Sequence, residues 1–146
     1  MILIPLKNEE QLGNEGATHK AILTHADLTE AAVTTAQTIG LASLQPKMSV
    51  RCVKAQLIVP FSCSTDSANN STALEVGDDG SVARFLASME LNSDGTEVFL
   101  KKGTTTDLVL TAANYVDAYV TPASGKALSA QDAGEVHIYL QITDGR

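Results

Sequence analysis

The sequence predicts an all-β protein, an antiparallel β-sandwich of the jelly-roll or immunoglobulin-like type with one or two short helical turns. Two segments, Tyr115–Val120 and Glu135–Thr143, alternate apolar and polar residues. Such alternation indicates strands that bury one face. Other strand-like runs recur at roughly 8–12-residue intervals between loops rich in Ser, Asn, Asp and Gly, which is typical of a sandwich or a small barrel.

The expected strands cover most of the chain. They are residues 34–43, 48–59, 72–76, 96–100, 106–111, 115–120 and 135–143. In the last strand we expect four side chains to face the core: Val136, Ile138, Leu140 and Ile142. The apolar positions of strand 48–59 change parity between Cys52 and Val53, which predicts a β-bulge or a bend. Pro60 is expected to end that strand, and Lys101–Gly103 to form a turn.

Two segments have helical features. Asp27–Glu30 resembles a capping box with Asp27 as the N-cap, which predicts one or two helical turns running to about Ala32. The apolar residues of Ser81–Leu91 fall both at helical spacing and at alternating positions. Since Asp79-Gly80 precedes this segment, a short helical turn is the favoured of the two readings.

Charge and composition exclude several classes of partner. The chain has 17 acidic and 10 basic residues, a net charge of −7, and Lys101-Lys102 is its one adjacent basic pair. A surface that binds nucleic acid needs clustered Lys and Arg, so we expect no nucleic-acid partner. No apolar stretch approaches the roughly 18 residues that span a bilayer, so we expect no membrane partner.

The chain has two cysteines, Cys52 and Cys63. Cys52 lies in an apolar run and is expected to be a buried, reduced thiol. A Cys52–Cys63 disulfide is the alternative if Val59-Pro60-Phe61 forms a turn.

No pattern in the sequence predicts an active site. The three histidines lie far apart, and there is no nucleophile elbow or phosphate-binding loop. The acids around Gly80 and Gly95 lack a calcium-loop spacing and are typical of turns. Asp78 and Asp79 are adjacent, whereas glycoside hydrolysis needs carboxylates that face each other across a sugar. We therefore expect a non-enzymatic protein without a cofactor or metal.

The N-terminal residues predict a contact surface. Residues 1–6 are apolar and residues 7–17 polar, so we expect an N-terminal arm at 1–17 and a single β-sandwich domain at 18–146. The arm either adds to the sheet edge of a neighbouring subunit or forms an edge strand of its own domain. Tyrosines expected to point outward complete the candidate interface, which comprises Met1, Ile2, Leu3, Ile4, Pro5, Leu6, Tyr115, Tyr119 and Tyr139.

A family resemblance is carried by several segments of the chain: Leu74–Gly80, Arg84–Ser88, Gly95–Val98, Gly134–Ile142, Ala26–Glu30 and Val59–Phe61. These segments resemble small structural proteins of tailed-bacteriophage virions, such as capsid decoration (cement) and head-fibre-like proteins. The resemblance runs from about His19 onward and its motifs are structural. It implies assembly with the major capsid protein or another virion component, a homo-oligomer (a trimer above all), and a virion location after synthesis in the host cytoplasm. The alternative is a carbohydrate- or receptor-binding module of a phage adsorption apparatus.

Overall fold

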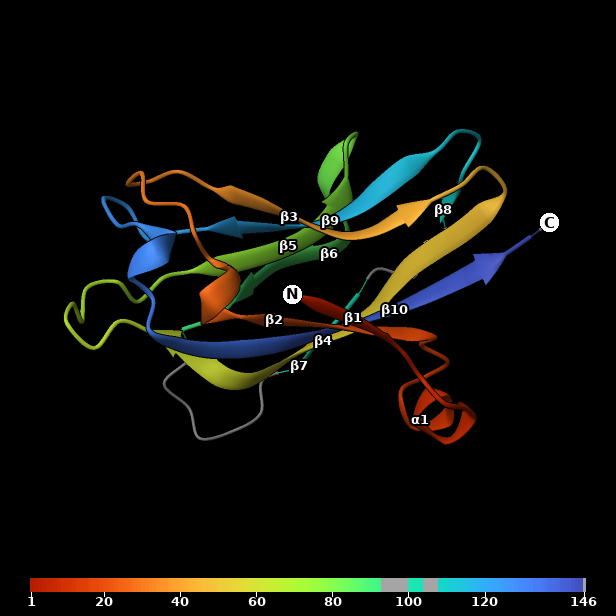
Figure 1. Cartoon of the computed structure of the whole chain (residues 1–146), viewed down its shortest axis with the longest axis horizontal. Helices are drawn as coiled ribbons and strands as arrows, with labels where there is room; N and C mark the ends of the chain where they lie inside the picture. The colour runs from red at the N-terminus through yellow and green to blue at the C-terminus, as the bar shows by residue number, and fades with distance from the viewer. Residues whose placement is uncertain (93–99, 104–107, 146) are drawn as a thin grey trace.

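Two antiparallel β-sheets packed face to face make up the protein in the computed structural model (Figure 1). The structure describes residues 1–92, 100–103 and 108–145. In these residues every strand pairing is antiparallel, and the helical segments are short. The predicted antiparallel β-sandwich is therefore confirmed.

Six described strands form one sheet and four form the other. The larger sheet contains β1 (Ile2–Pro5), β2 (His19–Thr24), β4 (Met48–Ser62), β7 (Leu100–Lys102), β8 (Leu108–Val109) and β10 (Ala133–Asp144). Its order is β1-β2-β10-β4-β7, and β8 also pairs with β4. The smaller sheet contains β3 (Gln37–Leu44), β5 (Ala73–Asp78), β6 (Ser81–Glu90) and β9 (Asn114–Thr121) in the order β3-β9-β5-β6. The helical segments are α1 (Asn8–Gly13), η1 (His25–Asp27) and η2 (Leu128–Ala130).

The main core lies between the two sheets, and the alternation in β9 and β10 supplies much of it. Val136, Ile138 and Leu140 are fully buried, and Ile142 is half-buried near the end of β10. β9 contributes Val116, Ala118 and Val120. The predicted register of both strands is confirmed.

A bulge in β4 explains its parity change. Cys52 pairs with Leu140 and Lys54 with Tyr139, so Val53 is an extra residue without a partner in β10. Cys52 faces the main core, whereas Val53 packs in a second cluster on the outer face. The strand does not end at Pro60, as we expected, but continues to Ser62. Pro60 falls within a register shift, where a residue without an N–H is tolerated.

The favoured helical turn at Ser81–Leu91 is wrong, because these residues form β6. Leu74 pairs with Met89 and Val76 with Leu86, so β6 advances three residues where β5 advances two. Bulges of this kind place buried side chains three residues apart and imitate helical spacing. The tertiary pairing with β5 therefore decides between the two readings.

Other local predictions also need correction. Asp27 is the last residue of η1, and its carboxylate accepts a hydrogen bond from the backbone N–H of the N-cap residue Thr24, 2.8 Å away. It therefore closes a capping box where we expected it to open one. Lys101 and Lys102 belong to β7 and pair with β4, not to a turn. Strand β2 and helix α1 were not predicted.

Three predicted segments lie partly outside the described residues. For the strands expected at 96–100 and 106–111, the structure describes residue 100 in β7 and residues 108–109 in β8. Of the three possible calcium ligands flanking Gly95, the structure describes Asn92, whereas Asp94 and Glu97 lie outside the described residues.

The N-terminal residues take the second of the two positions expected for them. Residues Ile2–Pro5 pair along their whole length with β2 of the same chain. The Leu6 N–H continues this ladder by donating to the Thr18 carbonyl oxygen, 2.8 Å away, and the Leu6 side chain is buried. Residues 1–6 are thus an edge strand of the sandwich, not an arm that extends from it.

We predict that Ile138→Ala lowers the free energy of unfolding by about 2–5 kcal/mol, because it removes buried methyl groups and leaves a cavity. His137→Ala, one residue away on the half-exposed face, is the matched control and should cost about 1 kcal/mol or less. Urea unfolding measures both values. Equal losses would show that the register of β10 is misassigned.

Candidate functional site

The nine predicted interface residues are divided among three surfaces. Tyr115 and Tyr119 lie on the outer face of the four-stranded sheet, because Val116, Ala118 and Val120 between and beside them face the core. Tyr139 lies on the outer face of the six-stranded sheet. These tyrosines therefore form no common aromatic platform of the kind that a sugar-binding module uses.

Tyr139 is not an exposed contact residue. It points away from the main core, as alternation predicts, but it is only 7% exposed. Leu6, Ala17 and Val53 pack with it in a second hydrophobic cluster, and its burial, with nearby Glu10, raises the pKa of Tyr139. The polar segment after β1 folds back over this face, which alternation within β10 cannot reveal.

Strand β1 has an unpaired outer edge with few hydrogen-bond donors. The bond from Leu6 to Thr18 places residues 2, 4 and 6 in hydrogen-bonded pairs with β2. The backbone groups of Leu3 and Pro5 consequently point away from β2, and Pro5 has no N–H to donate. Strand addition here is thus less favourable than the N-terminal composition suggests.

The side of the sandwich between β1 and β3 is open and apolar. Both are edge strands and lie toward the viewer in Figure 1. Met1 and Leu3 from one sheet, and Ile39 and Ala42 from the other, are partly buried and pack against the main core. We call these four residues the open-side seam.

The opposite side of the sandwich is closed. There β6 contacts β4 and β7, and the Phe61 N–H donates to the Leu91 carbonyl oxygen, 2.8 Å away. The Lys101 ammonium also donates to the Ser88 carbonyl oxygen. The seam is therefore a property of one side alone.

A buried carboxylate lies in the outer face of the four-stranded sheet. Asp117 pairs with Gly40 of β3 on one side and with Gly77 of β5 on the other. Neither neighbour has a side chain, so the carboxylate sits in a notch and is 7% exposed. A Cβ on Gly77 would lie 2.0 Å from the Ser81 carbonyl oxygen, which shows how closely β6 crosses at this point.

Asp117 has no cation to compensate its charge within the described residues. The Arg84 Nε is 2.7 Å from Asp78 Oδ2 and pairs with that carboxylate. The Tyr119 hydroxyl has one proton and donates it to the Asp78 carbonyl oxygen at 3.1 Å, whereas Asp117 Oδ2 is 3.5 Å away. Burial, and then the nearby carboxylate of Asp79, raise the pKa of Asp117.

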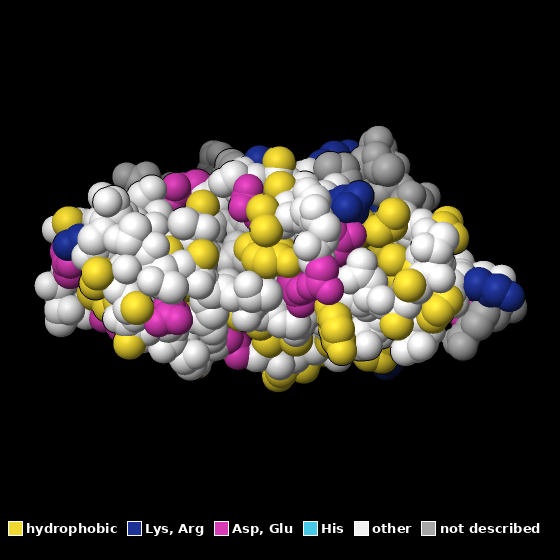
Figure 2. All heavy atoms as spheres, turned by 90° about the horizontal axis from the view of Figure 1, so that it is seen from above, with side chains coloured by type: hydrophobic (Ala, Val, Ile, Leu, Met, Phe, Trp, Pro, Cys, Tyr) yellow, Lys and Arg dark blue, Asp and Glu magenta, His cyan; other side chains and the backbone are white. Residues whose placement is uncertain are grey.

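The notch belongs to a wider group of acids, which we call the acidic face and define as Glu75, Asp79 and Asp117. Glu75 pairs with Tyr119, and Asp79 occupies the exposed β5–β6 turn. Figure 2 views this side of the molecule and shows acidic side chains gathered near its middle. Sequence analysis missed Asp117 because its glycine neighbours come from two other strands.

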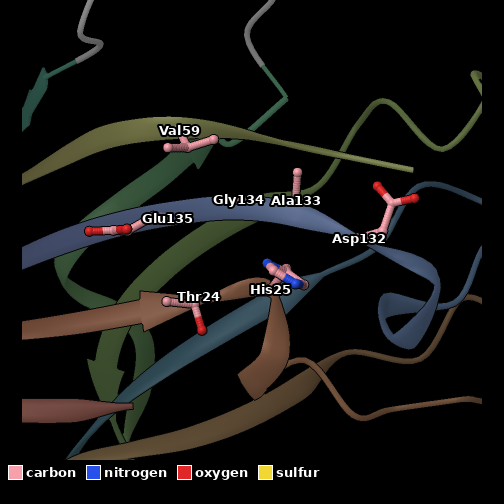
Figure 3. A pocket seen from close by; sticks show the side chains of 7 residues that line it. All are labelled: Thr24, His25, Val59, Asp132, Ala133, Gly134 and Glu135. Atoms are coloured by element: carbon pink, nitrogen blue, oxygen red, sulfur yellow. The ribbon is translucent and has the colours of Figure 1, made fainter. Parts of the chain in front are cut away.

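A shallow depression at the ends of β2, β4 and β10 contains titratable groups (Figure 3). It holds about 380 Å³ and is lined by His25, Asp132 and Glu135, among others. Asp132 accepts hydrogen bonds from the Ser64 N–H, at 2.9 Å, and hydroxyl, and Glu135 lies 2.6 Å from His137 Nε2. Figure 3 shows the two carboxylates at opposite ends of the depression. They do not face each other as an acid–base pair would.

Both cysteines are free and buried. Burial raises the pKa of Cys52 to about 12, which makes its thiol unreactive at neutral pH. The expected buried, reduced thiol is confirmed for Cys52, and the alternative disulfide is wrong.

Comparisons with protein-family models, curated proteins and solved structures found no match for this chain. In the part of the chain that the structure describes, no group of His, Cys, Asp or Glu is arranged to hold a metal ion. No helix among the described residues has the length and apolar character needed to cross a membrane.

We predict that Asp117→Asn raises the melting temperature at neutral pH, because it removes a buried charge repelled by Asp79. The folded-state pKa of Asp117 lies above its unfolded value of about 3.9. Stability therefore falls as pH rises through the interval between the two values, and the penalty is fully present above it. Thermal unfolding from pH 3 to pH 7 should show the variant's advantage growing with pH. An advantage that is constant across this range would contradict the assignment.

Proposed function

We propose that this protein is a non-enzymatic structural protein of a bacteriophage virion, which decorates or cements the capsid by binding the major capsid protein. The open-side seam is the observation that carries the proposal. A partner that covers it would complete the burial of apolar side chains that the two sheets leave half-exposed. Apolar burial of this kind is the main favourable term in protein association.

The shape of the molecule favours a protein partner over a small ligand. The described surface offers broad sheet faces and shallow depressions, and in the depression shown in Figure 3 the carboxylates are already hydrogen-bonded. Three of the segments that resemble phage structural proteins, at 74–80, 84–88 and 134–142, lie in the β5–β6 hairpin and in β10, which are framework elements. These segments support an architecture and a role in assembly shared with such proteins, but they do not identify contact residues.

The first test is whether the chain is present in purified phage particles at a fixed ratio to the major capsid protein. Quantitative mass spectrometry measures the ratio, and cryo-electron microscopy locates the density. Absence from particles, or a ratio far below that of the capsid lattice, would reject the proposal.

We predict that Ile39→Glu weakens binding to particles lacking the protein by about tenfold or more, because Ile39 lies in the seam and burying an isoleucine is worth about 1.5–3 kcal/mol. Leu12→Glu is the matched control, since Leu12 is 86% exposed and lies on α1, away from the seam. Co-sedimentation at several protein concentrations measures both affinities. Equal binding by the two variants would place the contact elsewhere, and thermal unfolding checks that both are folded.

A further inference from the structure

Lysines form a row across the outer face of the six-stranded sheet. Lys20 of β2 pairs with Tyr139 of β10, Tyr139 pairs with Lys54 of β4, and Lys54 pairs with Lys102 of β7. The Lys54 ammonium lies 4.9 Å from the centre of the Tyr139 ring, which places it over the outer face. We call Lys20, Lys54 and Lys102 the lysine row.

Contacts within the chain give the lysine row only modest support. Like charges directly opposite each other on neighbouring strands, as at Lys54 and Lys102, destabilise a sheet. Glu15 lies 3.2 Å from Lys102, but the two side chains are 53% and 71% exposed, so this ion pair contributes little. Glu10 approaches Tyr139 from the same segment. In a chain with a net charge of −7, three lysines in register on one face are better explained by a contact with an acidic partner surface.

The acidic face is on the opposite side of the sandwich and carries negative charge that is complementary to the lysine row. Asp117 is nine-tenths buried without a described cation partner, and Asp79 beside it is exposed. Arg84, a basic residue of the same sheet, forms an ion pair with Asp78. One molecule therefore presents three lysines in register on one broad face and the carboxylates of the acidic face on the other.

We propose that copies of this chain associate head to tail, with the lysine row of one copy against the acidic face of the next. A second copy is the occupant because both complementary surfaces belong to the same chain. The faces are on opposite sides, so the contact is heterologous and leaves one free face at each end of a pair, available for further copies. This inference goes beyond capsid binding and does not depend on it.

The contact is electrostatic and weak in free solution. Screening by salt should reduce it, because exposed charges interact over roughly 10 Å at 0.1 M ionic strength. At low ionic strength we expect the average mass from sedimentation equilibrium to rise with protein concentration, and to return toward the monomer as salt is added.

Charge reversal provides the decisive test. Lys54→Glu and Asp79→Lys should each weaken self-association by about tenfold or more, because each places like charges in the contact. An equimolar mixture should associate again, since the first variant keeps its acidic face and the second keeps its lysine row. Native mass spectrometry should then show mixed dimers in excess over dimers of either variant alone.

A matched control separates this contact from a general charge effect. Lys47→Glu makes the same charge change as Lys54→Glu at an exposed position outside both surfaces and should associate like the unmodified protein. Lys20→Glu tests the row at a second site if Lys54→Glu fails to fold, as judged by thermal unfolding. A protein that is monomeric at every concentration, or a mixture that remains monomeric, would overturn the proposal.

Discussion

The packing of both hydrophobic clusters depends on strand β10, because this strand buries side chains on both of its faces and pairs with a neighbouring strand on each edge. Its inner face enters the main core, and its outer face supplies Tyr139 to the second cluster. β4 must follow it closely and does so through a bulge at Val53. At the start of β10, Gly134 has a φ of +142°, and the Phe61 ring lies 2.3 Å from where a Cβ would be. Only glycine allows this ring to cross there.

Local periodicity predicted the fold where strands pair regularly, and it failed where pairing is irregular. The alternation of β9 and β10 located their core residues correctly. In β6, bulges against β5 produced helix-like spacing, so the sequence alone could not decide. The burial of Tyr139 also could not be predicted from the sequence. Alternation along a strand predicts the face on which a side chain lies, but not which residues cover that face. Leu6 and Ala17, which cover it, are remote in sequence from β10.

The acidic face and the lysine row were invisible in the sequence for a related reason. Each is built across strands from residues that are distant along the chain, so neither gives a charge run. Asp117 resembles any polar residue of an alternating strand until Gly40 and Gly77 are placed beside it. Lys20 and Lys54 are isolated cations until Tyr139 aligns them. The scattered basic residues led us to expect no nucleic-acid partner, and their spacing along the chain concealed an ordered row.

The proposed capsid contact and the proposed contact between copies use different sides of the sandwich, so one does not exclude the other. A net charge of −7 opposes association of free copies over long range. Attachment through the open-side seam would hold neighbours at a high effective concentration, at which a weak contact is occupied. Salt-sensitive ion pairs between the broad faces would then link bound copies without causing polymerisation of free copies. A protein assembled on this principle needs weak lateral contacts, and the exposure of Lys102 and Asp79 is consistent with such contacts.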